Sequence, residues 1–507
     1  MSPSRWWALP VVLVAVFMTT LDFFVANLAI PSIRAELAAG GSDAQLVIAA
    51  YGLAYAAGLV VSGRLGDLYG PRRVFVAGLA VFTLASAACG SAPSPGALVG
   101  ARATQGLAAA LLAPQVLTLL GALYRGADRP RAFGWYGTAV GLAGVGGQAI
   151  GGLLVAADPM GLGWRACFLV NVPLGLTALA LTPWLVPAPP TAVPAPRTAV
   201  PAVPAVPAVP AAAAVAAVPA AAPDRTAGPG ERGDGGLDVA GAALVAAGLV
   251  ALVLPLVQGR EHGWPAWTWP CLAASAPLLA AFTRRQRRLT AIGRQPLLDL
   301  DVFAAKGFAA GLVAVALLFG SSAGVSFVLA LYLQEGLRLG PLGAGLVCTA
   351  LNAGFFAASL RTGSLAGRLG HRLPLAGAVT LVLGLASLHH AVGSAVGSAG
   401  AAPYRVAGAL LVAGAGMGLV MSPLISAVLA RVQPARAGAA AGVLGTVQET
   451  GGVLGGTVTG TVLLGSLGTG WPAGAQAALT VPVVCALGVL AVLALTKPAL
   501  CRAPTCA

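Results

Sequence analysis

The segment GRLGDLYGPRR occupies residues 63–73 and lies between two apolar runs, 46–62 and 74–92. Each run is about long enough to cross the roughly 30 Å hydrocarbon core of a bilayer as a helix. Gly70 can adopt the positive φ of a tight turn, and Gly63 permits close helix packing. The three arginines of the segment anchor it to the inner membrane surface, where basic residues concentrate. The segment therefore predicts a short cytoplasmic turn between two transmembrane helices.

The same pattern returns 300 residues further along the chain. Internal repeats are common in secondary transporters, whose substrate site lies at the repeat interface near the middle of the bilayer. The chain is therefore predicted to consist of two related halves. The residues that recur are Gly63, Leu65, Gly70 and Arg72, which return as Gly363, Leu365, Gly370 and Arg372.

Apolar runs of spanning length occur along the whole chain apart from one central stretch. Of the 507 residues, 58% are hydrophobic and only 9% are charged, whereas a soluble domain has roughly a quarter of its residues charged. The runs predict an all-α integral membrane protein with 14 transmembrane helices. They lie at 7–28, 46–62, 74–92, 97–120, 134–156, 166–186, 238–258, 267–283, 307–333, 341–360, 373–393, 405–430, 438–466 and 475–496.

The basic residues orient these helices. An even number of spans places both termini on one side, and 23 of the 29 Lys and Arg fall in segments on that side. Five fall in the opposite loops, and Arg102 falls within a span. Because cytoplasmic loops carry the excess of Lys and Arg, both termini are predicted to be cytoplasmic. The net charge of +14 then reflects membrane topology and does not indicate a nucleic-acid partner.

Residues 187–237 interrupt the apolar pattern. They contain 12 Pro and the run VPAVPAVPAVP, and Pro at every third position blocks a helix and favours an extended chain. We interpret this stretch as a cytoplasmic linker without chemistry. The predicted organisation is a six-helix bundle over 1–186, the linker over 187–237, two extra transmembrane helices over 238–283, a basic cytoplasmic loop over 284–306, a second six-helix bundle over 307–496 and a cytoplasmic tail over 497–507.

Three ionisable residues fall within the predicted spans: Asp22, Arg102 and Glu449. A charge in the bilayer is costly, so such residues suggest function. At 1.5 Å per residue, Asp22 lies roughly 22 Å from the inner face, and Arg102 about 7 Å below the outer face of a core of about 30 Å. The two share one depth and can form an ion pair. One hypothesis is that Asp22 exchanges protons under the control of Arg102. The alternative is a static pair that holds two helices together.

Glu449 lies in a stripe of glycines on one helical face, so it is predicted to point into protein or a cavity. It could bind a cationic substrate, carry a second proton or remain protonated and hydrogen-bonded. A second stripe contains Gln148, and such stripes usually mediate close helix packing. The first stripe comprises Gly438, Gly442, Gly445, Glu449, Gly452, Gly456 and Gly460, and the second Gly134, Gly137, Gly141, Gly144, Gln148 and Gly151.

The segment at 63–73 resembles the cytoplasmic loop motif of the major facilitator superfamily. The resemblance implies a major facilitator fold, with two six-helix bundles and an inserted helix pair, and a charge relay in which Asp67 and Arg72 gate the cytoplasmic side. The predicted gating loop thus comprises Gly63, Asp67, Gly70 and Arg72. The repeated loop has Gly367 in place of Asp67, so a full relay is not expected there.

Three further segments resemble the branch of 14-span drug:proton antiporters. They are LDFFVANLAIP (21–31), GARATQGLAAALLAP (100–114) and GWRACFLVNVPLG (163–175). The resemblance places Asp22 at the acidic position of the first span and implies proton coupling by Arg102. One departure is Gln148 in GGQAIGG (146–152), where the branch has Pro, so a kink is not expected there.

These features favour one class of function. The chain has no P-loop lysine and no cluster of His, Cys or carboxylates with catalytic or metal-ligand spacing, so it is predicted to be no enzyme and to bind no metal or cofactor. It is predicted to be a monomer in the cell membrane that exports hydrophobic or cationic drugs in exchange for protons. The alternatives are a dedicated exporter of one natural metabolite, such as an antibiotic, and a non-transporting membrane sensor or scaffold. The predicted substrate pocket contains Phe23, Phe24, Asn27, Gln105, Gln148 and Gln448.

Overall fold

The computed structural model is helical throughout its described part. It describes residues 4–124, 128–186, 238–259, 263–294, 296–298, 300, 303, 307–394, 402–429, 432 and 437–496, and no strand occurs among them. Twelve helices in this part of the chain are long and apolar enough to cross a membrane. Two more, α2 and α10, have spanning lengths of 29 and 24 residues. The predicted fold class, an all-α integral membrane protein, is confirmed.

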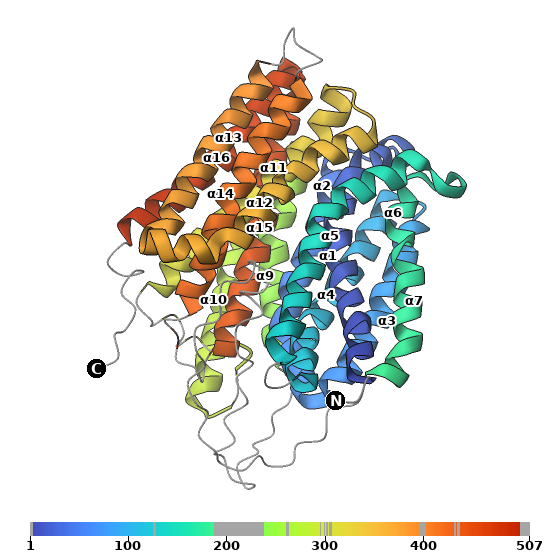
Figure 1. Cartoon of the computed structure of the whole chain (residues 1–507), viewed down its shortest axis with the longest axis vertical. Helices are drawn as coiled ribbons and strands as arrows, with labels where there is room; N and C mark the ends of the chain where they lie inside the picture. Colours follow the sequence, from blue (N-terminus) through green and yellow to red (C-terminus); the bar gives the residue numbers. More distant parts are fainter. Residues whose placement is uncertain are drawn as a thin grey trace.

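The helices form two halves, which lie side by side in Figure 1, and a further pair. The N-terminal half contains α1 (Ser4–Leu37), α2 (Gly41–Tyr69), α3 (Pro71–Gly90), α4 (Pro95–Leu123), α5 (Asp128–Ala157), the short turns η1 (Pro159–Gly161) and η2 (Gly163–Arg165), α6 (Ala166–Leu169) and α7 (Asn171–Leu185). The pair is α9 (Val239–Gln258) and α10 (Thr268–Ala291). The C-terminal half contains α11 (Phe308–Leu331), the π-helical turn η4 (Tyr332–Gly336), α12 (Pro341–Leu369), η5 (Gly370–Arg372), α13 (Leu373–Gly393), α14 (Ala402–Leu429), α15 (Ala437–Ser466), η7 (Leu467–Thr469) and α16 (Trp471–Leu495).

The predicted cytoplasmic turn at 63–73 lies between α2 and α3. Gly70 has φ +89° and Pro71 starts the next helix, so the predicted positive-φ turn is confirmed. Gly370 has φ +51° at the end of α12. The predicted packing role of Gly63 is wrong in this structure, because no described atom outside its own helix lies within 4 Å of where a Cβ would stand. Gly66 has that role, since a Cβ there would meet the Gln115 side-chain amide of α4 at 2.3 Å.

The two halves meet along two seams, α2 with α15 and α5 with α12. Small residues permit the contact, because a Cβ on Gly152 of α5 would stand 2.4 Å from the Pro341 carbonyl oxygen of α12. The side on which the chain begins is called here the N-terminal side. On the opposite side, Arg34 pairs with Glu335 at 2.9 Å, and Gln334 donates a hydrogen bond of 3.1 Å to the Leu28 carbonyl. The halves are therefore joined on the side away from the N-terminus.

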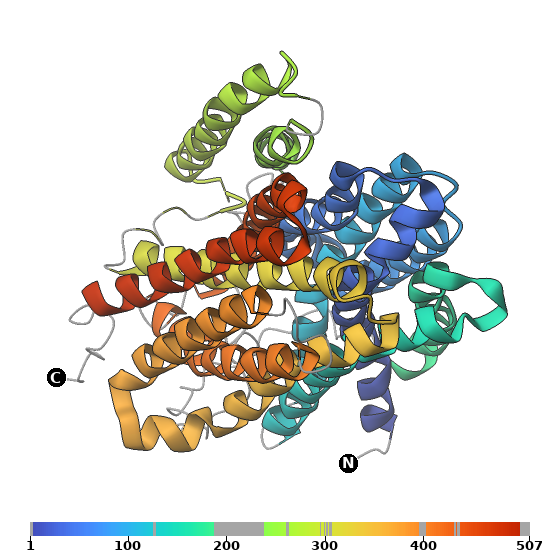
Figure 2. The ribbon, with the colours of Figure 1, turned by 90° about the horizontal axis from the view of Figure 1, so that it is seen from above.

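The pair α9–α10 lies outside both halves, beside the α2–α15 seam (Figure 2). Val245, Leu249 and Val253 of α9 share an apolar cluster with Leu46 and Leu53 of α2. On the other side of the seam, the Thr461 hydroxyl of α15 donates a hydrogen bond of 3.4 Å to the Leu256 carbonyl of α9. Helix α9 thus touches both halves.

A hydrogen-bond network fixes the N-terminal side of this pair. Asp238 caps α9 through the Gly241 N–H (2.9 Å) and binds Arg285 (2.6 Å) and Gln286 (2.9 Å) of α10. Burial raises the pKa of the Asp238 carboxyl, but the hydrogen bonds from Gly241, Arg285 and Gln286 outweigh it and hold the pKa below its usual value. These contacts extend α10 to Ala291, so the basic residues predicted to start a loop at 284 lie on a helix.

The close approach of α4 to α2 gives a test of the fold. A Cβ on Gly106 of α4 would stand 2.2 Å from the Tyr51 carbonyl oxygen of α2, whereas a Cβ on Gly100 of the same helix would meet nothing within 4 Å. We expect Gly106→Ala to destabilise the protein by about 1–3 kcal/mol through overpacking. Gly100→Ala should leave stability unchanged or slightly raised. Thermal unfolding in detergent, read by size-exclusion chromatography, would contradict the packing if both variants melted alike.

Candidate functional site

A cavity of about 340 Å³ lies between the two halves. Helices α1 and α2 of the N-terminal half and α11, α12, α14 and α15 of the C-terminal half supply nearly all of its lining. A second cavity of about 200 Å³ shares Thr20, Tyr55 and Gln448 with it and reaches Ala15 of α1 and Val116 of α4, toward the N-terminal side. The space therefore runs from the middle of the molecule toward the N-terminal side and is closed on the other side.

Aromatic rings form much of the cavity wall. On the N-terminal half, Phe23 and Phe24 meet edge to face with centroids 5.4 Å apart, and Tyr51 and Tyr55 stack at 6.1 Å. The C-terminal half contributes Phe319, Phe327 and Phe355. Such a wall suits a flat apolar molecule, because ring faces stack on one another and exclude water.

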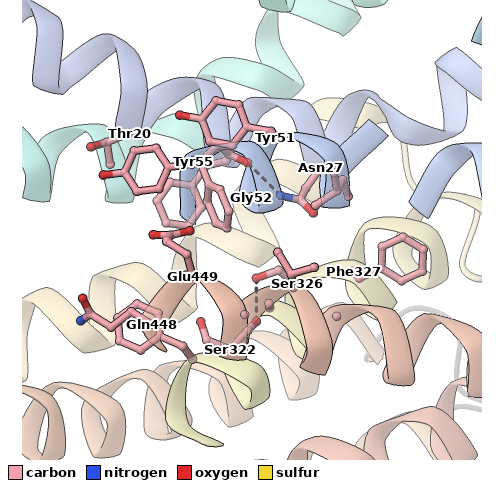
Figure 3. Close-up of a pocket in the computed structure, with 18 of the residues that line it drawn as sticks. Thr20, Asn27, Tyr51, Gly52, Tyr55, Ser322, Ser326, Phe327, Gln448 and Glu449 are labelled. Atoms are coloured by element: carbon pink, nitrogen blue, oxygen red, sulfur yellow. Dashed lines mark hydrogen bonds between the residues drawn. The ribbon is translucent and has the colours of Figure 1, made fainter. Parts of the chain in front are cut away.

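Glu449 is the one Asp, Glu, Lys or Arg among the described residues that line this cavity. It projects from α15 toward the facing half, where Tyr51 and Tyr55 lie (Figure 3). Its neighbours Gly452 and Gly456 line the cavity as well. The glycine stripe around Glu449 was expected to mediate close helix packing, and this expectation is wrong for these members.

The tight helix contact of α15 uses other glycines. A Cβ on Gly455 would stand 2.2 Å from Gly320 of α11, and a Cβ on Gly451 would stand 2.5 Å from the Ala316 carbonyl oxygen. These residues lie beside the stripe on the helix surface. Within the stripe, Gly452 and Gly456 leave room at the cavity, which is why a carboxyl group can stand beside them.

Behind the cavity wall, Asp22 of α1 and Arg102 of α4 form a buried ion pair. The Asp22 carboxylate also accepts hydrogen bonds from Gln105 Nε2 (2.8 Å) and Asn171 Nδ2 (3.1 Å). Arg102 donates to Gln105 Oε1 (2.7 Å) and to the Val47 carbonyl of α2 (3.1 Å). Four helices, α1, α2, α4 and α7, thus supply partners for two opposite charges in an apolar interior.

Tyr51 connects this network to the cavity. Its ring centroid lies 4.3 Å from the guanidinium carbon of Arg102, a cation–π distance. Tyr51 is also part of the cavity lining. A molecule bound in the cavity would therefore lie one aromatic side chain away from the Asp22–Arg102 pair.

The predicted pocket residues divide into two groups. Phe23, Phe24, Asn27 and Gln448 line the cavity. Gln105 and Gln148 do not, and their assignment to the pocket is corrected. Gln105 is bound to Asp22, Arg102 and the Ser86 hydroxyl (2.9 Å). Gln148 is buried where α5 meets α12, since its carbonyl oxygen lies 2.5 Å from where a Cβ on Gly345 would stand.

The predicted gating loop is held to α7. Arg72 donates a hydrogen bond of 3.2 Å to the Pro183 carbonyl, near the end of that helix. The side chain of Asp67 lies outside the described part of the structure, so the expected relay between Asp67 and Arg72 remains a prediction. What the structure does show is a link between the first residues of α3 and the last turn of α7.

Several site residues were not among the predicted pocket residues. Tyr51 and Tyr55 stand four residues apart on one face of α2, a spacing that would have marked a polar aromatic stripe in an otherwise apolar run. Asn171, already quoted within a motif, binds Asp22. Gln45 and Asn352 also line the cavity, and only the contacts between halves reveal this.

Comparison with known proteins agrees with this architecture. The sequence profile of the Major Facilitator Superfamily matches residues 12–456. The chain belongs to the major facilitator superfamily. It is therefore a multi-pass membrane transporter of small molecules and not an enzyme.

Relatives within the superfamily include exporters of antibiotics. The chain is 36% identical over 466 residues to a probable actinorhodin transporter of Streptomyces coelicolor, covering 92% of this chain and 73% of that protein. It is 33% identical to the puromycin resistance protein of Streptomyces alboniger, covering 92% and 83%. It is also 33% identical to the cephamycin export protein of Amycolatopsis lactamdurans, covering 90% and 86%.

Solved structures of other transporters share the fold. A bacterial homolog of the human lysosomal transporter Spinster, crystallised inward-facing and unoccupied, aligns over 100% of both chains with a TM-score of 0.65 and 14% identity. A peptide transporter in complex with sulfate aligns over 97% of this chain and 95% of that one, with a TM-score of 0.65 and 17% identity. The arrangement of helices is thus shared with these two transporters.

The buried pair of this transporter predicts a characteristic pattern of stability. Asp22→Asn leaves the Arg102 charge buried without a counter-ion, which should cost about 3–5 kcal/mol. Adding Arg102→Gln removes that charge, so the double variant should recover part of the loss. Denaturation of the single and double variants in detergent measures the coupling. Strictly additive losses would show that the two side chains do not stabilise each other.

Proposed function

We propose that the chain is a proton-coupled exporter that moves hydrophobic or cationic compounds out across the cytoplasmic membrane in exchange for protons. The observation that carries this proposal is the buried Asp22–Arg102 pair, one side chain behind the central cavity. A carboxylate that can gain or lose its counter-ion is a device for taking up and releasing protons.

In this mechanism the proton and the substrate act on the same hydrogen-bond network. The proton binds Asp22, and the substrate contacts Tyr51, which lies against Arg102. While Arg102, Gln105 and Asn171 surround Asp22, they stabilise its ionised form. A movement of α4 relative to α1 would separate Arg102 from Asp22. The carboxylate would then lie in an apolar interior without a counter-ion, where the protonated form is favoured. Tyr51 touches Arg102 and also lines the cavity. A compound that binds in the cavity and moves Tyr51 would therefore change how easily Arg102 separates from Asp22.

The direction of transport follows from the orientation. The 23 Lys and Arg predicted on the side of the termini favour placing the N-terminal side in the cytoplasm. The cavity then extends toward the cytoplasm, while the Arg34–Glu335 pair closes the outer side. This state can load a compound from inside the cell. The names of two relatives, a puromycin resistance protein and a cephamycin export protein, support the outward direction.

The loop between α2 and α3 has a gating role in this proposal. Gly70 makes the sharp turn, and Arg72 ties the start of α3 to the end of α7. Gly63 has no described neighbour within 4 Å of where a Cβ would stand, so it leaves α2 free to approach the other half when the cytoplasmic side closes. Asp67 would then pair with a cation across the closed gate. The transporter works as a monomer, with protons and the lipid bilayer as its further partners.

A narrower function is favoured by the relatives. Three of them are named for single antibiotics, namely actinorhodin, puromycin and cephamycin. The second candidate is therefore a dedicated exporter of one natural metabolite. Accumulation assays with a panel of competitors distinguish the two, because a dedicated exporter is inhibited by one structural class and a drug exporter by many.

Proton coupling is tested with Asp22→Asn. In inverted membrane vesicles with an acidic interior, the wild-type chain should accumulate N-methylacridinium, a planar cationic dye, until a protonophore collapses the gradient. Asp22→Asn should abolish this accumulation, because an amide cannot exchange a proton. Exchange of labelled for unlabelled dye without a gradient should persist.

The double variant Asp22→Asn/Arg102→Gln controls for folding. It removes the unpaired buried charge and should also exchange dye without accumulating it. Gradient-driven accumulation by Asp22→Asn at the wild-type level would disprove the proton role of Asp22.

The charge of Glu449 predicts a selective defect. We expect Glu449→Gln to raise the KM for N-methylacridinium about tenfold, because a hydrogen-bonded charge contact contributes more than a neutral one. Transport of a neutral dye of similar size should change little. Kinetics in vesicles measure both, and an unchanged KM for the cation would exclude Glu449 from substrate binding.

A further inference from the structure

Two amide groups in the cavity wall have donors without partners. Gln45 Nε2 and Asn352 Nδ2 are buried atoms with no hydrogen-bond acceptor in the described structure. Both residues line the central cavity. A buried donor without a partner is costly, and native structures rarely leave one unless something binds to it. These amides therefore indicate where a hydrogen-bond acceptor of the substrate would lie.

The two donors come from different halves and different depths. Gln45 lies on α2, about 6 Å along the axis from Gly41, the first residue of that helix. Asn352 lies on α12, about 16 Å from its first residue, Pro341. Both helices start on the side away from the N-terminus. Their donors are therefore spaced along the depth of the cavity, and one elongated molecule can reach both.

A glycine makes room for the outer donor. A Cβ on Gly460 of α15 would stand 2.3 Å from Gln45 Nε2 and 2.8 Å from the ring of Phe327. Any larger residue would displace the amide or the ring. Gln45 is 4% exposed, and its Nε2 atom lies between the Phe327 ring and the Gly460 backbone without an acceptor.

The amide of Asn27, which also lines the cavity, is in a different state. Asn27 Nδ2 already donates to the Phe23 carbonyl at 2.8 Å (Figure 3). The described lining contains no Lys or Arg, and its one Asp or Glu is Glu449. An anionic compound would therefore find no counter-ion here. A neutral compound needs none, and a cationic compound can approach the Glu449 carboxyl group.

We infer that the substrate is a flat, multi-ring aromatic compound without negative charge whose carbonyl or quinone oxygens accept hydrogen bonds from Gln45 and Asn352. Its rings lie among Phe23, Phe24, Tyr51 and the facing aromatic side chains. The inference rests on the proposed function, because it names the substrate class of the same cavity. It excludes organic acids, sugars and saturated lipids, which lack either the ring faces or the charge that this wall accepts.

The donors also explain how the compound is held at both halves. Gln45 belongs to the N-terminal half and Asn352 to the C-terminal half, so a compound bound to both amides bridges them. When the halves rearrange to open the other side, one of the two bonds must lengthen. The affinity then falls on the side of release, as an exporter requires.

The test compares two flat three-ring probes by equilibrium binding to the full chain in lipid nanodiscs. Quinizarin is a neutral anthraquinone with carbonyl oxygens, and N-methylacridinium is a cation without oxygen acceptors. Gln45→Met and Asn352→Leu remove one donor each at similar size. We expect each variant to weaken quinizarin binding about 3- to 10-fold, as for a lost neutral hydrogen bond. Binding of N-methylacridinium should stay within about twofold of wild type.

Asn352→Asp supplies a readout that a packing defect would not give. It keeps the shape of Asn352 and replaces its donor with a second acceptor and a negative charge. Quinizarin binding should weaken and N-methylacridinium binding should tighten. Equal losses for both probes in every variant, no change for either, or no binding of quinizarin to the wild-type chain would overturn the inference.

The same protein separates this inference from the proposed function. Binding in nanodiscs requires no proton gradient, so a failure of gradient-driven accumulation in vesicles would overturn proton coupling and leave the binding result standing. Conversely, the proton gradient could drive transport of N-methylacridinium while Gln45→Met and Asn352→Leu leave quinizarin binding unchanged. That result would keep the proposed function and overturn the inferred substrate class.

Discussion

The hydrocarbon interior of a membrane offers a charged side chain no water, so every charge placed there must find its partners within the protein. Asp22 and Arg102 meet this constraint together, and doing so fixes the arrangement around them. Their hydrogen bonds reach α1, α2, α4 and α7. The N-terminal half is thus organised around one ion pair, and the same interaction would be the part of the structure that a proton can alter.

The C-terminal half solves the same problem differently. Its embedded carboxylate, Glu449, is placed at the cavity among glycines, with no basic residue among the described lining residues. One half therefore contains a neutralised pair behind the wall, and the other contains a single acid on the wall. This difference fits an arrangement in which the N-terminal half responds to protons while side chains of both halves meet the substrate.

The sequence predicted those features that depend on distance along one helix. Asp22 and Arg102 were expected at one depth from the helical rise alone, and the structure brings them into contact. The Gly70 turn follows from the conformational freedom of glycine. Predictions that depend on how a helix is rotated about its axis were less successful. Gln148 faces a helix interface, and the tight contacts of α15 with α11 belong to Gly451 and Gly455. The spacing of residues along a helix shows which of them share a face, but it does not show which helix packs against that face.

The helix pair α9–α10 makes the molecule asymmetric within the membrane plane. Helix α9 lies against the α2–α15 seam, whereas the α5–α12 seam has large apolar side chains exposed on its helices, among them Leu142, Leu153 and Leu346. In a bilayer, lipid tails would contact the α5–α12 seam directly, whereas the pair α9–α10 would separate them from the α2–α15 seam. The two halves are alike in fold, but their two seams have different surroundings. The membrane therefore acts unequally on the two seams that must open and close.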